Sequence, residues 1–165
     1  MATSSSEIFD TSGIRLNKDA CVVIISTDWN RQIVGELEAG CISVLKANSV
    51  AYKHIIVPGA VEITFAIADF WRKQEDKFVK PDAFIALGCV IKGDTPHFEY
   101  VCQSVTNGIT SLNTSLPVPT IFGVLTVNTD EQARERIGGI HGHKGEEAAA
   151  TAIKMIALSQ SFNEN

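Results

Sequence analysis

Four short apolar runs, each followed by a segment of helical length, constrain the fold of this chain more than any other feature. The runs span residues 20–27, 54–57, 83–91 and 120–127 and are rich in β-branched side chains. The first run, ACVVIIST, is apolar at successive positions, which is typical of a parallel strand buried on both faces. Repeated strand–helix units predict an α/β fold, a three-layer α/β/α sandwich around a four-stranded parallel sheet.

Segments with helical periodicity fill the connections between these runs. They predict helices over residues 31–48, 60–75, 95–113, 130–137 and 144–158. Asn30 is placed to cap the first helix, and Gly138-Gly139 to end the fourth. Because neither a linker nor a repeat divides the chain, we expect one domain over residues 19–165, preceded by a flexible arm over residues 1–18.

The composition suits one globular domain and argues against several classes of partner. A chain of 165 residues that is 45% hydrophobic can bury roughly 70% of its unfolded surface. The net charge is −5 and no basic stripe is present, so we expect no nucleic-acid partner. No apolar run reaches the roughly 20 residues that span a bilayer, and the polar start lacks the features of a secretory signal. We therefore expect no membrane association.

The cysteines and histidines do not form a recognisable metal or redox motif. None of the four cysteines belongs to a C-x-x-C pair, which argues against a zinc site or a redox dithiol. Cys21 and Cys89 fall in predicted buried strands, where cysteine usually acts as a small hydrophobic residue. His141 and His143 form an H-x-H pair without a third ligand at typical spacing, so no metal is predicted. We expect reduced thiols and a cytoplasmic protein.

The third apolar run leads directly into the segment GCVIKGDTPHFEY, residues 88–100, where ligand chemistry is expected. In open parallel sheets, ligands bind at the carboxyl ends of the strands. Gly88 and Gly93 have the spacing of a G-x-x-x-x-G-K-[ST] loop, but Asp94 stands where the lysine should be, which argues against a nucleoside triphosphatase. Glycine and helix N–H groups in this turn can still hold a single phosphate. No G-x-G-x-x-G follows the first run, which argues against a dinucleotide-dependent dehydrogenase.

Several side chains near the strand ends have both a functional and a structural interpretation. His97 is the best acid–base candidate because imidazole titrates near neutral pH, but it is equally explained as a surface histidine in a first helical turn. Trp29 can stack on a flat heterocycle or simply pack. Glu62 is ordinarily a charge at a helix start, and Arg136 and Lys144 are ordinarily solvated helix charges. Residue types alone leave these alternatives open.

Read together, these segments resemble the lumazine synthase family over residues 13–162. The resemblance rests on motifs that occur in the family's order. They are VPGAVE at 57–62, GCVIKGDTPHFEY at 88–100, IFGVLT at 121–126, EQA at 131–133 with Arg136, and Gly142 with Lys144-Gly145. Enzymes of this family condense 5-amino-6-(D-ribitylamino)uracil with 3,4-dihydroxy-2-butanone 4-phosphate, the penultimate step of riboflavin biosynthesis. The resemblance implies a flavodoxin-like sheet and a transferase that needs neither a metal nor an organic cofactor, because the substrate amine is itself the nucleophile.

The resemblance also implies roles for individual residues. Trp29 would stack on the pyrimidine, His97 would shuttle protons, and Lys144 would steady developing charge. Arg136, from the next subunit, would bind phosphate together with the turn formed by Gly93, Asp94 and Thr95. The ribityl chain and uracil edge would be held by Asn30, Gly59, Ala60, Val61, Glu62, Cys89, Val90, Ile91 and Phe122.

Three positions depart from the family's pattern. Val61 replaces an aromatic residue and makes one wall of the pocket slimmer. Asp94 replaces a small neutral residue, and we expect its carboxylate to point away from the phosphate because like charges repel. His143 stands where asparagine is common, which leaves open a second titrating group.

The resemblance implies a homo-oligomer with active sites between neighbouring subunits. The family forms pentamers, some of which build icosahedral shells of sixty subunits, and riboflavin synthase is an implied partner. The short segment 137–142 is of the kind compatible with a shell. The alternative is a non-catalytic flavin- or lumazine-binding shell protein, for which His97 and Arg136 would be unnecessary. A third reading, an archaeal-type riboflavin synthase, is disfavoured by the segment 88–100.

Overall fold

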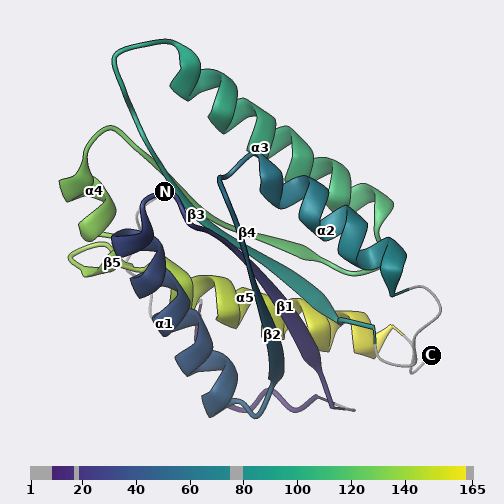
Figure 1. Cartoon of the computed structure of the whole chain (residues 1–165). Coiled ribbons are helices and arrows are strands. Elements are labelled where there is room, and N and C mark those ends of the chain that lie inside the picture. The colour runs from purple at the N-terminus through teal and green to yellow at the C-terminus, as the bar shows by residue number, and fades with distance from the viewer. Residues whose placement is uncertain (1–8, 17–18, 75–79, 163–165) are drawn as a thin grey trace.

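Four parallel strands form the central sheet, and helices cover both of its faces (Figure 1). The computed structural model describes residues 9–16, 19–74 and 80–162. Its elements, in chain order, are β1 (Cys21–Thr27), α1 (Arg31–Ala47), β2 (Ala51–Val57), α2 (Glu62–Lys73), β3 (Ala83–Ile91), α3 (His97–Ser115), β4 (Thr120–Val127), α4 (Asp130–Arg134), β5 (Ile137–Gly139), β6 (Gly142–His143) and α5 (Lys144–Ser161). The predicted α/β sandwich with four parallel strands is confirmed.

The order of the strands in the sheet is β2-β1-β3-β4, as in flavodoxin-like folds. The connection through α1 leads from β1 to β2 on one side, whereas the connection through α2 leads back past β1 to β3 on the other. β2 is thus added to one side of β1, and β3 to the other, so the direction in which strands are added to the sheet reverses at β1. A crevice forms at such a switch point, outside the carboxyl ends of the strands, and it is the usual binding site of this architecture.

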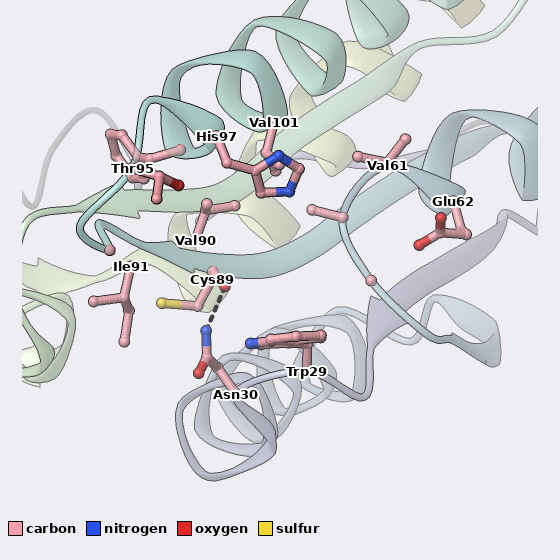
Figure 2. Close-up of a pocket in the computed structure, with 14 residues that line it drawn as sticks. Trp29, Asn30, Val61, Glu62, Cys89, Val90, Ile91, Thr95, His97 and Val101 are labelled. Carbon is pink, nitrogen blue, oxygen red and sulfur yellow. Dashed lines mark hydrogen bonds between the residues drawn. The ribbon is translucent and has the colours of Figure 1, made fainter.

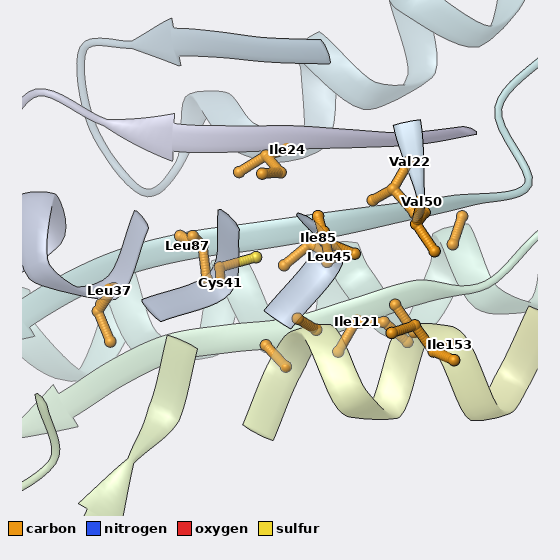
Figure 3. Close-up of a cluster of buried hydrophobic side chains, with 14 of the residues drawn as sticks. Val22, Ile24, Leu37, Cys41, Leu45, Val50, Ile85, Leu87, Ile121 and Ile153 are labelled. Atoms are coloured by element: carbon orange, nitrogen blue, oxygen red, sulfur yellow. The ribbon is translucent and has the colours of Figure 1, made fainter. Parts of the chain in front are cut away.

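Alternate side chains of β1 supply two separate hydrophobic clusters, one on each face of the sheet. Val22 and Ile24 pack with residues of α1 and α5, in the cluster drawn in Figure 3. Val23 and Ile25 pack with residues of α2 and α3. All four side chains are at most 1% exposed, which explains why the strand reads as a continuous apolar run.

Helices α1 and α5 approach closely because glycines stand at their contact. A Cβ on Gly145 would overlap the backbone carbonyl of Leu37, and a Cβ on Gly40 would overlap the ring of His143. The alanine-rich face of α5 allows the same close approach, with Ala149 and Ala152 completely buried. This contact fixes the start of α5, and with it the preceding β5–β6 hairpin, against α1.

The fourth predicted helix is where the structure differs most from expectation. It ends at Arg134, and β5 and β6 then form an antiparallel hairpin over part of the segment predicted to be helical. Gly138 and Gly142 have φ values of +111° and +80°, a region that glycine adopts without strain. The predicted helix is confirmed at its start, Asp130, but its predicted end at Ile137 before Gly138-Gly139 is wrong, because these residues belong to the hairpin.

Smaller differences follow from where each element lies. β2 begins at Ala51, three residues before the predicted start at position 54, because the first residues of this edge strand alternate between exposed and half-buried positions and so lack a continuous apolar signal. Much of the predicted flexible arm, residues 1–18, lies outside the described residues, as does Glu75 at the predicted end of α2. Ile14 and Leu16, within the described part, pack against the α1–α5 side of the sheet.

Candidate active site

A pocket of about 420 Å³ lies at the carboxyl ends of β1, β2 and β3, at the switch point of the sheet. Three strand-end turns and the first turns of α3 form its walls (Figure 2). The residues that line it are Trp29, Asn30, Gly59, Ala60, Val61, Glu62, Cys89, Val90, Ile91, Gly93, Thr95, His97, Phe98 and Val101. The structure thus brings together most of the predicted site residues, which come from separate motifs.

Trp29 presents its indole to this pocket from the turn after β1. Its side chain is 72% exposed, so it does not pack in the core of this chain and lines the pocket instead. The N–H of Asp28 donates to the Val57 carbonyl at 2.8 Å, and the N–H of Trp29 donates to the Pro58 carbonyl at 3.1 Å. These bonds join the turn after β1 to the turn after β2, so the walls they form are fixed relative to each other.

Asn30 lies at the N-cap position of α1 but does not cap it. Its backbone is left-handed, with φ 58° and ψ 40°, a conformation that asparagine tolerates better than most residues. Its side-chain amide donates to the backbone carbonyl of Cys89 at 2.8 Å instead of accepting from the helix (Figure 2). The predicted capping role is wrong: the side-chain amide is bonded to β3, its oxygen accepts no hydrogen bond from the start of α1, and the left-handed backbone differs from the extended one typical of a capping residue.

The turn between β2 and α2 places Glu62 at the rim of the pocket. The N–H of Glu62 donates to the Gly59 carbonyl at 3.3 Å, which closes a tight turn as α2 begins. Glu62 is exposed and lies in the first turn of the helix, where a carboxylate complements the helix dipole. The same geometry also leaves the carboxylate accessible to a ligand in the pocket.

The turn after β3 brings a candidate phosphate site and a histidine to the pocket. Gly93 and Thr95 line the cavity, whereas Asp94 does not. α3 begins at His97 rather than at the predicted position 95, because Pro96 holds the N-cap position. The exposed His97 side chain lies across the pocket from Trp29 and Asn30 (Figure 2). N–H groups at the start of a long helix and an imidazole are thus adjacent.

Cys89 is the one thiol among the residues that line this pocket. Burial, and to a lesser extent the nearby carboxylate of Asp130, raises the pKa of the Cys89 thiol to about 11. The thiol is therefore uncharged at neutral pH and is a poor nucleophile. Cys89 serves as a small apolar wall, as expected for a buried strand, while Cys21 at the start of β1 is only half-buried.

Two residues of the pocket were not predicted from the sequence. Phe98 and Val101 line it together with His97, from the first turns of α3. Residues four apart on a helix share a face, so Val101 could have been predicted from His97. Phe98 is half-buried and follows His97 directly, without a periodicity signal that separates it from other helical apolar residues.

Four predicted site residues do not line the pocket within this chain. Phe122, on β4, is half-buried among residues of the α2–α3 side of the sheet. Arg136 and Lys144 lie near the β5–β6 hairpin and share one carboxylate, that of Glu147, at 3.0 and 3.5 Å. Arg136 also donates to the backbone carbonyl of His141. Asp94, the fourth of them, lies in the turn but outside the lining.

The two histidines of the H-x-H motif are directed to different partners. His143 lies against Gly40 of α1, and its Nδ1 is buried without a hydrogen-bond partner. His141 lies near Glu135, with Nε2 3.5 Å from the carboxylate. Within residues 9–16, 19–74 and 80–162, no cluster of three or more potential metal ligands is found.

Among the helices of this part of the chain, none is long and apolar enough to cross a membrane.

Comparison with known proteins gives one consistent family. The family model described as 6,7-dimethyl-8-ribityllumazine synthase matches residues 19–160. A protein of that name from Porphyromonas gingivalis is 46% identical over 155 residues, which cover 92% of this chain and 93% of the relative. One from Parabacteroides distasonis is 42% identical and covers 96% of this chain and 99% of the relative. One from Bdellovibrio bacteriovorus is 46% identical over 86% of this chain and 76% of the relative.

Proposed function

This chain belongs to the 6,7-dimethyl-8-ribityllumazine synthase family, and we propose that it condenses 5-amino-6-(D-ribitylamino)uracil with 3,4-dihydroxy-2-butanone 4-phosphate. The observation that carries this proposal is the single pocket shared by Trp29, His97 and the turn at Gly93 and Thr95. An aromatic plane, an imidazole and a phosphate turn are the groups that this reaction needs. The product would be 6,7-dimethyl-8-ribityllumazine, made in riboflavin biosynthesis.

The uracil would bind between the turns after β1 and β2. Trp29 offers an exposed indole for stacking, and Val61, 44% exposed, forms an apolar rim. The Glu62 carboxylate can accept hydrogen bonds from ribityl hydroxyls, because it is exposed at the pocket rim. Backbone groups of Gly59, Ala60 and the end of β3 would hold the remaining polar edge.

The phosphate would bind at the turn before α3. Gly93 leaves open space for an approaching anion, since a Cβ at this position would meet no atom within 4 Å. The Thr95 hydroxyl and the N–H groups at the start of α3 are donors, and the helix dipole favours a negative charge there. A cation is missing from this arrangement, and we assign it to Arg136 of a neighbouring subunit, with Lys144 near the developing charge.

His97 would move protons as the reaction proceeds. The substrate amine attacks the ketone carbon, and the carbinolamine loses water to give an imine. Loss of phosphate and ring closure with a second loss of water then give the lumazine. Protonation of leaving oxygens and removal of carbon-bound protons suit an imidazole, which contributes typically about 10²–10⁴-fold. Holding both substrates in one pocket contributes roughly 7–11 kcal/mol, the larger share of the acceleration.

We assign the chain to a homo-oligomer, a pentamer that can assemble further into an icosahedral shell. Large apolar side chains exposed on the isolated chain support this assignment, among them Phe65, Tyr100, Ile140 and Phe162, each 68–78% exposed. The hairpin connection between β5 and β6 is short, which suits a shell. Cytoplasmic location and association with riboflavin synthase are part of the same proposal.

A non-catalytic flavin- or lumazine-binding protein is the second candidate, and the exposed Trp29 indole is the observation that favours it. Purified protein mixed with both substrates separates the two functions. Lumazine absorbance and fluorescence should appear well above the uncatalysed rate. If the rate equals that without protein while riboflavin still binds, the binding function replaces the enzyme.

A further inference from the structure

A polar network around the buried Glu38 carboxylate begins one residue after Asn30 and lies outside the residues that line the pocket. Arg31, the first residue of α1, makes a two-pronged contact with Glu38, with N–O distances of 2.5 and 2.6 Å. Nε2 of His54, on β2, lies 3.2 Å from Oε1 of the same carboxylate and 2.7 Å from the Ser26 hydroxyl on β1. Glu38 is thus held by groups from α1, β1 and β2.

An arginine at the first position of α1 does not stabilise that helix. The first turn of α1 contains no acidic residue, and Asn30 provides no side-chain cap. A cation at the N-terminus of a helix is unfavourable, because the helix dipole is positive there. Glu38 neutralises Arg31 from two turns further along, and its own side chain is only 7% exposed. A buried carboxylate needs charged or hydrogen-bonding partners, so this contact limits the conformations of both side chains.

Within its own chain, the Trp29 ring has little packing to fix its direction. With 72% of its surface exposed there, the indole depends within this chain on the backbone of residues 29–31 for its orientation. That backbone carries the left-handed Asn30, whose amide reaches Cys89. A two-pronged Arg31–Glu38 contact immediately after Asn30 holds this turn at its helical end, as the Asn30–Cys89 bond holds it at the pocket.

We propose that Glu38, acting through Arg31, is a positioning residue that holds the Trp29 indole in the orientation needed to receive the pyrimidine substrate. His54 and Ser26 hold Glu38 from the sheet side. This inference rests on the proposed function for the identity of the substrate, but the orientation of Trp29 can be measured without turnover. Neither Glu38 nor Arg31 touches the pocket, so both act through the turn.

The test uses the full-length protein with Trp71→Phe, which leaves Trp29 as the single fluorescent tryptophan of the two in the chain. Glu38→Gln keeps the shape of the side chain and removes its charge. We expect the KM for 5-amino-6-(D-ribitylamino)uracil to rise about five- to tenfold, with kcat changed less than about twofold. The KM for the phosphorylated substrate should not change. Trp29 fluorescence anisotropy, measured without substrates, should fall.

Two further variants separate positioning from general destabilisation. Arg31→Lys retains the charge that Glu38 needs but loses the two-pronged contact, so it should raise the same KM by a smaller factor while folding normally. Asp69→Asn is the matched control, because Asp69 on α2 also contacts two cations, Arg72 at 3.5 Å and Lys73 at 2.6 Å. It should change neither KM nor anisotropy.

The outcomes distinguish this inference from the proposed function. If the wild type makes no lumazine, the proposed function fails, and the anisotropy of Trp29 still decides whether Glu38 positions it. If the wild type is active but folded Glu38→Gln and Arg31→Lys proteins keep wild-type KM and anisotropy, the positioning role is overturned. A fall in kcat without a change in either KM also overturns it.

Discussion

The Asn30 side chain donates a 2.8 Å hydrogen bond to the Cys89 backbone carbonyl and so joins the turn after β1 to the end of β3. These residues are 59 positions apart in the chain. The bond crosses the point where the sheet reverses its order, and the pocket opens directly beside it. Asn30 thereby lines the pocket and joins the turn that carries Trp29 to β3.

Asn30→Ala should destabilise the fold by about 1–3 kcal/mol, because it removes the bond to Cys89 and places a residue that disfavours a positive φ at this position. Asn30→Gly is the matched variant, since glycine adopts φ 58° without strain and loses only the hydrogen bond. Urea unfolding of both proteins measures the two contributions. Equal stabilities for the alanine and glycine variants would show that the backbone conformation contributes nothing.

His97→Ala should lower kcat about 10²-fold or more and leave both KM values near wild type, because an exposed imidazole assists proton transfer but holds neither substrate alone. Residual turnover should remain, since the pocket still brings the substrates together. Steady-state assays of lumazine formation measure this split. Complete loss of activity with intact substrate binding would mean that His97 has a larger role than general acid–base catalysis.

Arg136→Ala should raise the KM for 3,4-dihydroxy-2-butanone 4-phosphate about tenfold or more, because it removes a charge-assisted contact to phosphate. The matched control is Arg134→Ala, which removes an exposed arginine paired with Asp130 on the same segment. A mixed oligomer of Arg136→Ala and His97→Ala chains should regain activity when the two residues act from different subunits. An unchanged KM in Arg136→Ala would remove this residue from the phosphate site.

Gly145→Ala should lower the free energy of unfolding by about 1–3 kcal/mol, because its Cβ would overlap the Leu37 carbonyl where α5 meets α1. Gly35→Ala is the contrasting substitution. Gly35 lies inside α1, with no atom within 4 Å of an added Cβ, so alanine should stabilise the protein by about 0.5–1 kcal/mol. Thermal unfolding compares the two, and a neutral Gly145→Ala would show that the helices separate without cost.

Stability below neutral pH should depend on Glu38. Burial alone would raise the pKa of this carboxyl, but hydrogen bonds from Arg31 and Ser26 and the nearby His54 outweigh burial and lower it below 4.5. A carboxyl whose pKa is lower in the folded state contributes stability that is present above the unfolded value and is lost as pH falls through the folded value. Glu38→Gln should therefore show a flatter dependence of unfolding free energy on pH below 4.5. Burial, and to a lesser extent the Glu38 charge, raises the pKa of the Cys41 thiol to about 12, so this thiol remains neutral in this range.

The elements that the sequence predicts best are those with a strong local signal. The strands at Ala83–Ile91 and Thr120–Val127 match the prediction residue for residue, because strands buried on both faces are apolar at nearly every position. The edge strand β2 and the β5–β6 hairpin gave weaker signals, since one is half exposed and the other consists of very short strands held by glycine turns. Half-exposed strands such as β2, and short hairpins, depend on their neighbours more than on their own residues, whereas β4, the other edge strand, is buried along most of its length.

The layered fold, the strand ends that carry ligand chemistry and the family can all be inferred from the order of the residues. The partners of the polar side chains cannot, and they become visible only in the folded chain. It placed the Asn30 amide on Cys89, the Glu38 carboxylate between Arg31 and His54, and both Arg136 and Lys144 on Glu147. The physical reason is that apolar periodicity is a property of neighbouring residues, whereas a hydrogen-bond partner depends on how strands and helices distant in the chain are brought together.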